Sequence, residues 1–208
     1  MYQMRFLCYN KAYDSLRIKV VIHEKTVLFF LLAILTAVMA GCGKETPEDQ
    51  FAFGNARVFC ADSVITLRLP FELAIQGKPS DEVPSDPDSV TAGGSNSYMQ
   101  VIAAGRKTDT DIDTAAADSM QSMKDNGAVS GLQSQKSEGQ IGDERAAVLR
   151  FQFTETDRGK AADLSVVEYI FREGNVLWRV IYQYRTQDET GKALAGYTAG
   201  RIVSGYQM

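Results

Sequence analysis

The chain has 208 residues with 22 basic and 26 acidic side chains, which gives a formal net charge of −4 at pH 7. It contains no basic run and no basic patch interleaved with aromatic residues, so we expect no nucleic-acid partner. Its only histidine, His23, lies near the N-terminus, and this position limits the chemistry that is open to the rest of the chain.

A hydrophobic run begins after Lys25 and ends just before a cysteine. From Val27 to Ala40 the sequence carries no charge, and its only polar side chain is Thr36. The ~14 residues of this run are fewer than the ~20 that a helix needs to cross a bilayer. A basic residue before the run and small residues after it are typical of a secretory signal.

The last four residues of this region, Met39-Ala40-Gly41-Cys42, resemble the bacterial lipobox, in which small residues lead into an obligatory cysteine. The resemblance implies that the Cys42 thiol takes a diacylglycerol and that a peptidase cuts before it. Residues 1–41 are then a lipoprotein signal peptide, whose unusual length suggests a later translation start. Two or three acyl chains, at ~0.8 kcal/mol per buried methylene, make a stable anchor. An uncleaved signal anchor is the alternative.

Processing before Cys42 would remove His23 and leave a mature domain without histidine. Ser-His-Asp and Cys-His catalysis, histidine zinc sites and histidine pH switches would then be excluded. Cys8 also leaves, so Cys60 has no cysteine with which to form an internal disulfide. Because Cys60 lies in the apolar run "ARVFC", we expect a small buried side chain and not a reactive thiol.

We predict a polar tether over residues 42–54 and one α+β domain over residues 55–208. "ARVFCADSVITLRLP" predicts two short strands joined by a tight Ala-Asp-Ser turn. The following segment is rich in Pro, Gly, Ser and Asp, and we expect a mobile loop at about residues 78–96. "SYMQVIAAG" then predicts another strand.

The clearest helix is predicted within "DTDIDTAAADSMQSMKDNG". Four apolar side chains share one face of it: Ile112, Ala116, Met120 and Met123. Asp109 or Thr110 can cap its start, and Asn126 with Gly127 ends it.

Three aspartates at the start of this helix alternate along the sequence, as in a calcium-binding loop. They are Asp109, Asp111 and Asp113. Thr114 and Met120 stand where an EF-hand needs a glycine and an acid. We therefore predict helix capping and compensation of the helix dipole, and no metal site.

The C-terminal half is predicted to be rich in strands. "ERAAVLRFQFTE" alternates like a strand, and "LSVVEYIFREGNVLWRVIYQYR" predicts a hairpin of two long strands around Glu173-Gly174-Asn175. A last helix is predicted around Leu194 to Val203, although its glycines weaken it.

These elements predict an α+β fold with a central antiparallel sheet and helices packed on it. The phrase "ITLRLPFE", a helix that opens on Asp and Ile, the long hairpin and a closing "RIVSGY" resemble the PsbP-like superfamily over roughly residues 56–206. The resemblance implies an α/β/α sandwich. Because members of this superfamily share no catalytic residues, it assigns no site residue to this chain.

Two groups of side chains stand out as candidates for a site. Glu168 is the only acid among core-like neighbours, and we place it on the wet face of the sheet, opposite Arg179 as a cross-strand pair. Tyr182 and Tyr184 are the candidate partner surface, since tyrosine is favoured at interfaces. Sheet core accounts for most of the aromatic residues in the hairpin, and these two, near the strand end, are the ones to test first for a partner.

The favoured hypothesis is a non-enzymatic lipoprotein that binds or supports another component of the cell envelope. It has no cofactor, and the acylated Cys42 holds it in the bilayer. One alternative is a carboxylate-based envelope hydrolase, which needs two acids ~5 to 9 Å apart in a pocket. Another is a ligand-binding accessory of a transporter, which needs a concave site. Gly43 is not the aspartate that marks inner-membrane retention in enteric-type envelopes, so the cell membrane and the outer membrane are both allowed locations.

Overall fold

The computed structural model describes residues 46–75 and 88–205. The predicted signal peptide, Cys42 and residues 78–87 of the predicted loop lie outside the described residues. The described residues belong to one folded unit, which begins at Thr46. None of the helices within it is long and apolar enough to span a bilayer.

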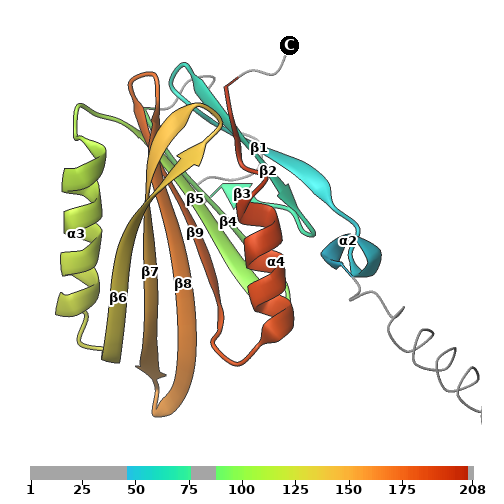
Figure 1. Cartoon of the computed structure of the whole chain (residues 1–208), viewed down its shortest axis with the longest axis vertical. Coiled ribbons are helices and arrows are strands. Elements are labelled where there is room, and N and C mark those ends of the chain that lie inside the picture. The colour runs from blue at the N-terminus through green and yellow to red at the C-terminus, as the bar shows by residue number, and fades with distance from the viewer. Residues whose placement is uncertain (1–45, 76–87, 206–208) are drawn as a thin grey trace, which may run out of the picture. The chain divides into compact units, whose positions relative to one another are not determined.

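Within these ranges, ten strands form two antiparallel sheets (Figure 1). The large sheet has the order β3-β4-β5-β9-β8-β7-β6, and the small sheet has the order β1-β2-β10. The strands are β1 (Gly54–Cys60), β2 (Ser63–Leu69), β3 (Ala74–Ile75), β4 (Ser89–Ser95), β5 (Met99–Lys107), β6 (Val129–Ile141), β7 (Glu144–Asp157), β8 (Lys160–Glu173), β9 (Val176–Arg185) and β10 (Val203–Ser204). The described helices are α2 (Pro47–Gln50), α3 (Ile112–Asp125) and α4 (Glu189–Ala199).

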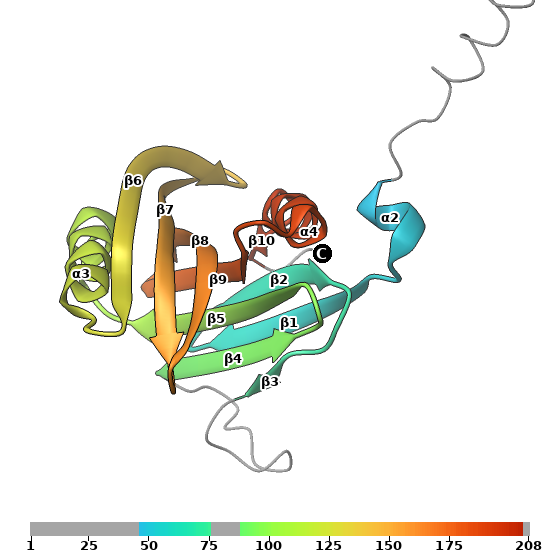
Figure 2. The same ribbon diagram turned by 90° about the horizontal axis from the view of Figure 1, so that it is seen from below.

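Both faces of the large sheet are covered, but by different elements. The small sheet and α4 pack on one face, over β4, β5 and β9, and α3 packs on the other face, over β6, β7 and β8 (Figure 2). Two hydrophobic cores result, one on each face. The fold is therefore antiparallel and sheet-dominated, with few helices, so that the predicted helix-covered sandwich is only partly matched.

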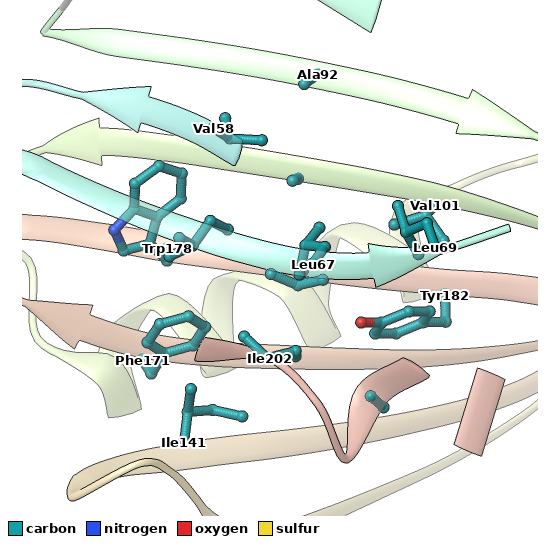
Figure 3. Close-up of a cluster of buried hydrophobic side chains, with 14 of the residues drawn as sticks. Val58, Leu67, Leu69, Ala92, Val101, Ile141, Phe171, Trp178, Tyr182 and Ile202 are labelled. Carbon is teal, nitrogen blue, oxygen red and sulfur yellow. The ribbon is translucent and has the colours of Figure 1, made fainter. Parts of the chain in front are cut away.

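The alternation of β9 divides its side chains between the two cores. Trp178, Val180 and Tyr182 are fully buried between the large and small sheets, as Figure 3 shows for Trp178 and Tyr182. Leu177 and Ile181 belong to the core under α3. The sequence predicted this alternation, but it did not show that the second face would also be buried.

Several predicted elements are confirmed. β1 and β2 pair from Cys60 and Ser63 outward, and Ala61 of the turn has φ +48°. β8 and β9 pair from Glu173 and Val176, and the turn between them contains Gly174 at φ +60°, a conformation that glycine adopts without strain.

The predicted mobile loop at 78–96 is wrong for its last part, because residues 89–95 form β4. Val90 and Ala92 of this strand are buried in the core between the sheets. Gly94 is needed for packing, since a Cβ atom there would lie 2.3 Å from the backbone oxygen of Glu72. The small residues that suggested a loop thus allow close approach of the chain.

The predicted tether at 42–54 is wrong from residue 46 onward. Thr46 and Asp49 form a capping box at α2, and Phe51 and Phe53 pack against the core between the large and small sheets. The Tyr197 hydroxyl of α4 donates a hydrogen bond to Glu48. These contacts hold the segment on the domain.

At the other end of the chain, the predicted helix is displaced. α4 begins at Glu189 and ends at Ala199, and Val203 instead pairs with Thr66 of β2.

Candidate functional site

Glu168 lies in β8 beneath α3, with a side chain that is only 2% exposed. Its Oε1 accepts a hydrogen bond of 2.6 Å from Arg179 Nε, and its Oε2 accepts one of 2.5 Å from the Ser119 hydroxyl. The predicted ion pair with Arg179 is confirmed. The predicted position directly opposite Arg179 is wrong, because Glu168 faces Ile181 in the register and the pair is diagonal. The predicted wet face is wrong, because α3 brings the buried Ser119 over the carboxylate.

Arg179 is held in place by this buried acid while part of it remains at the surface. Its side chain is 41% exposed, and Nη2 donates to Ser119 Oγ at 3.2 Å. The two hydrogen bonds leave three of its five N–H groups without a protein partner among residues 46–75 and 88–205. A buried carboxylate without a partner would be costly, so Glu168 fixes the guanidinium firmly.

A cavity of about 320 Å³ opens beside this network, and we call it the Arg179 cavity. It lies where β4, β5 and β9 extend past α3. Thr91, Ala104 and Ala115 line it with small side chains, and Arg106, Asp118 and Arg179 line it with charged ones. Arg106 and Asp118 are exposed, and their side chains make no hydrogen bond or ion pair with any described residue.

The position of α3 beside the cavity is fixed at its first turn. Asp111 is the N-cap, and its carboxylate accepts a bond of 2.8 Å from the Thr114 amide, so the predicted caps Asp109 and Thr110 are wrong. The backbone oxygens of Thr110 and Thr108 instead accept hydrogen bonds from the Arg172 guanidinium, at 2.7 Å each.

Asp113 joins the same turn to the sheet. It accepts hydrogen bonds from Arg145 and Lys136, which lower the pKa of its carboxyl to about 2. The predicted capping role thus falls to Asp111, and Asp113 pairs with basic side chains of the sheet. The described residues contain no group of three metal-ligating side chains.

A second cavity, of about 550 Å³, lies at the edge where β1 approaches β3 and β4. Its lining combines apolar residues, among them Val58, Leu69 and Phe71, with polar ones such as Asn55 and Arg57. Glu72 is the only acid among its described lining residues, just as Asp118 is in the Arg179 cavity.

Tyr182 is buried and cannot offer its side chain to a partner, so that half of the predicted partner surface is wrong. β9 turns it into the core between the sheets, and burial raises the pKa of its hydroxyl. That hydroxyl has no hydrogen-bond partner among the described residues. Tyr184 is half-buried and packs against the same core, so a contact between Tyr184 and a partner stays a prediction.

Cys60 is fully buried, as expected for a structural thiol. Arg106 and Asp118 were not predicted as site residues, because isolated surface charges form no recognisable motif in a sequence. Strand pairing places Arg106 next to Arg179, since Arg179 faces Ala104, two residues before Arg106. Asp118 reaches the same cavity from α3.

No protein-family model and no curated protein matches this sequence. Among solved structures, the chain is similar to LpqN, described as involved in cell envelope biogenesis of Mycobacterium tuberculosis. The identity is 12% and the TM-score 0.45, over 79% of this chain and 100% of LpqN. It is also similar to PA94 of Pseudomonas aeruginosa, a protein of unknown function. Here the identity is 10% and the TM-score 0.43, over 65% of this chain and 99% of PA94. Both TM-scores are too low to bear on function.

Proposed function

We propose that this chain is a lipid-anchored, extracytoplasmic binding module of the cell envelope and not an enzyme. The proposed location rests on the lipobox-like residues Met39-Ala40-Gly41-Cys42. The folded unit begins at Thr46, four residues after Cys42, and a chain of four steps spans at most ~14 Å when extended. A domain tethered so briefly works close to the bilayer surface.

The observation that carries the proposal of binding is the Arg179 cavity. It presents a guanidinium that a buried carboxylate has already oriented, and such preorganisation lowers the cost of holding a ligand. This concave site favours a small ligand, as an accessory of a transporter would have.

Catalysis by carboxylates is poorly supported by the same geometry. Glycoside hydrolysis needs two acids on either side of one substrate. The described lining of each cavity contributes only one acid, Asp118 or Glu72. Glu168, the acid buried beside the Arg179 cavity, is engaged by Arg179 and Ser119.

Metabolic labelling with a radioactive fatty acid in a bacterial host tests the anchor. We expect the full-length chain to carry label and to fractionate with membranes, and Cys42→Ser to lose both. Cys60→Ala is the matched control, because that thiol is buried in the domain and should leave labelling unchanged. Equal labelling of the chain and of Cys42→Ser would contradict the proposal.

A further inference from the structure

We propose that the Arg179 cavity binds a small peptide-like zwitterion, with its carboxylate on Arg179 and Arg106 and its ammonium group on Asp118. This inference rests on the proposed function as a binding module and names the chemistry of its ligand. It follows from the donors of the cavity, its charges and its size.

Arg179 supplies a fixed donor fork. Its Nε is committed to Glu168 and one Nη2 hydrogen to Ser119, so that the Nη1 side of the guanidinium is left for a ligand. Planar guanidinium groups match carboxylates with two parallel hydrogen bonds. Because Glu168 and Ser119 already hold this side chain, little of its rotamer entropy remains to be lost on binding.

Arg106 lies on the same face of the sheet as Arg179. Arg179 pairs with Ala104 and Arg106 pairs with Leu177, so the two arginines are diagonal neighbours on adjacent strands. Such neighbours have Cα atoms roughly 7–8 Å apart, a separation that long side chains bridge easily. Both side chains line the cavity and can therefore converge on one carboxylate.

The charges of the cavity favour a ligand that carries both signs. The Arg179 guanidinium is compensated by Glu168, which leaves one free positive charge on Arg106 and one free negative charge on Asp118 of α3. A simple anion would gain from Arg106 but be repelled by Asp118, whereas a zwitterion can pair with both. The charge pattern thus separates these two ligand classes.

The size of the cavity is consistent with such a ligand. Its volume of about 320 Å³ lies at the small end of ligand pockets, which are typically ~300 to 1,000 Å³. Small side chains on its floor, such as Ala104 and Thr91, leave room for it.

Titration of the full-length chain in detergent, followed by amide NMR shifts, tests the inference. The probe is L-alanyl-L-alanine, compared with its N-acetyl derivative, which lacks the ammonium group, and its amide, which lacks the carboxylate. We expect saturable shifts at Ala104, Arg106 and Asp118 with the dipeptide, and at least about tenfold weaker binding of each blocked probe. No shift up to about 10 mM, or equal binding of the three probes, would overturn the inference.

Two variants locate the binding. Arg106→Gln and Asp118→Asn should each weaken dipeptide binding by about tenfold without changing Tm, because neither side chain has a protein partner among the described residues. Arg57→Gln, an exposed arginine that does not line this cavity, should bind as the original chain does. Unchanged affinity in both cavity variants would place the dipeptide elsewhere and reject the assignment. If the original chain carried no fatty-acid label, the lipid anchor would be refuted, but the result of this titration would still stand.

Discussion

Replacing Arg179 by methionine tests whether the buried ion pair organises the candidate site. The substitution keeps the apolar stem of the side chain and removes the donor that holds Glu168 Oε1 at 2.6 Å. Breaking a fully buried pair from one side costs roughly 3–5 kcal/mol. Since the Arg179 side chain is 41% exposed, water can solvate part of the orphaned carboxylate. We therefore expect a loss of about 2–3 kcal/mol in the free energy of unfolding.

Urea unfolding, monitored by the fluorescence of Trp178, measures this loss. In a domain of this size about 2–3 kcal/mol corresponds to a fall in Tm of roughly 4–12 °C. The double variant Arg179→Met with Glu168→Met should recover part of the stability, because no charge is then left buried. Arg106→Gln serves as the control and should change the free energy of unfolding by less than about 0.5 kcal/mol. If Arg179→Met costs no more than this control, the pair does not have the organising role described above.

Three further substitutions probe the fold around the site. The pKa of the Asp113 carboxyl is about 2 in the folded protein, against 3.8 unperturbed, so this group loses its stabilising effect as the pH falls from about 4 toward 2. Asp113→Asn should remove this part of the acid-induced loss of stability. A pH series of thermal melts measures the change, and a pH profile that matches the original chain would contradict the prediction. Gly105→Ala should destabilise by roughly 1–3 kcal/mol in urea, since its Cβ would lie 2.6 Å from the Trp178 ring, whereas Gly127→Ala has open space and should be nearly neutral; equal effects of the two would refute the packing. Ser63→Ala should cost about 1–3 kcal/mol, because it leaves the buried Trp178 indole N–H without its acceptor at 2.8 Å, and a neutral result would show that this bond is not made.

The elements that sequence reasoning found are those with a repeated apolar pattern. Strand β9 alternates through Val176, Trp178, Val180 and Tyr182, and α3 repeats its apolar side chains at helical spacing. In both cases the period of the buried side chains is itself the signal of the element, so local sequence was sufficient.

β6 was not predicted, because it has almost no buried side chain to reveal it. Ile141 is its only fully buried residue, and the rest of the strand is largely Ser, Gln, Lys and Glu. Its hydrogen bonds to β7, from Val129 to Ile141 with one irregularity, hold it in the sheet. Backbone pairing leaves no pattern in the side chains, and so this strand was not visible in the sequence.

The site was only half visible for a related reason. The pairing of Glu168 with Arg179 follows from the hairpin register, which local sequence determines. Its burial depends on α3, whose Ser119 comes from a segment 49 residues earlier in the chain. The pattern of residues in a strand does not show which face of the sheet a helix will cover, because this depends on tertiary packing.

Intact-mass analysis of the chain isolated from bacterial membranes tests the central claim most directly. A lipid-anchored binding module predicts a species that begins at Cys42 and carries the mass of a diacylglycerol, with or without a further acyl chain, and that lacks residues 1–41. A species that retains the leader and has an unmodified Cys42 thiol would contradict both the anchor and the envelope location.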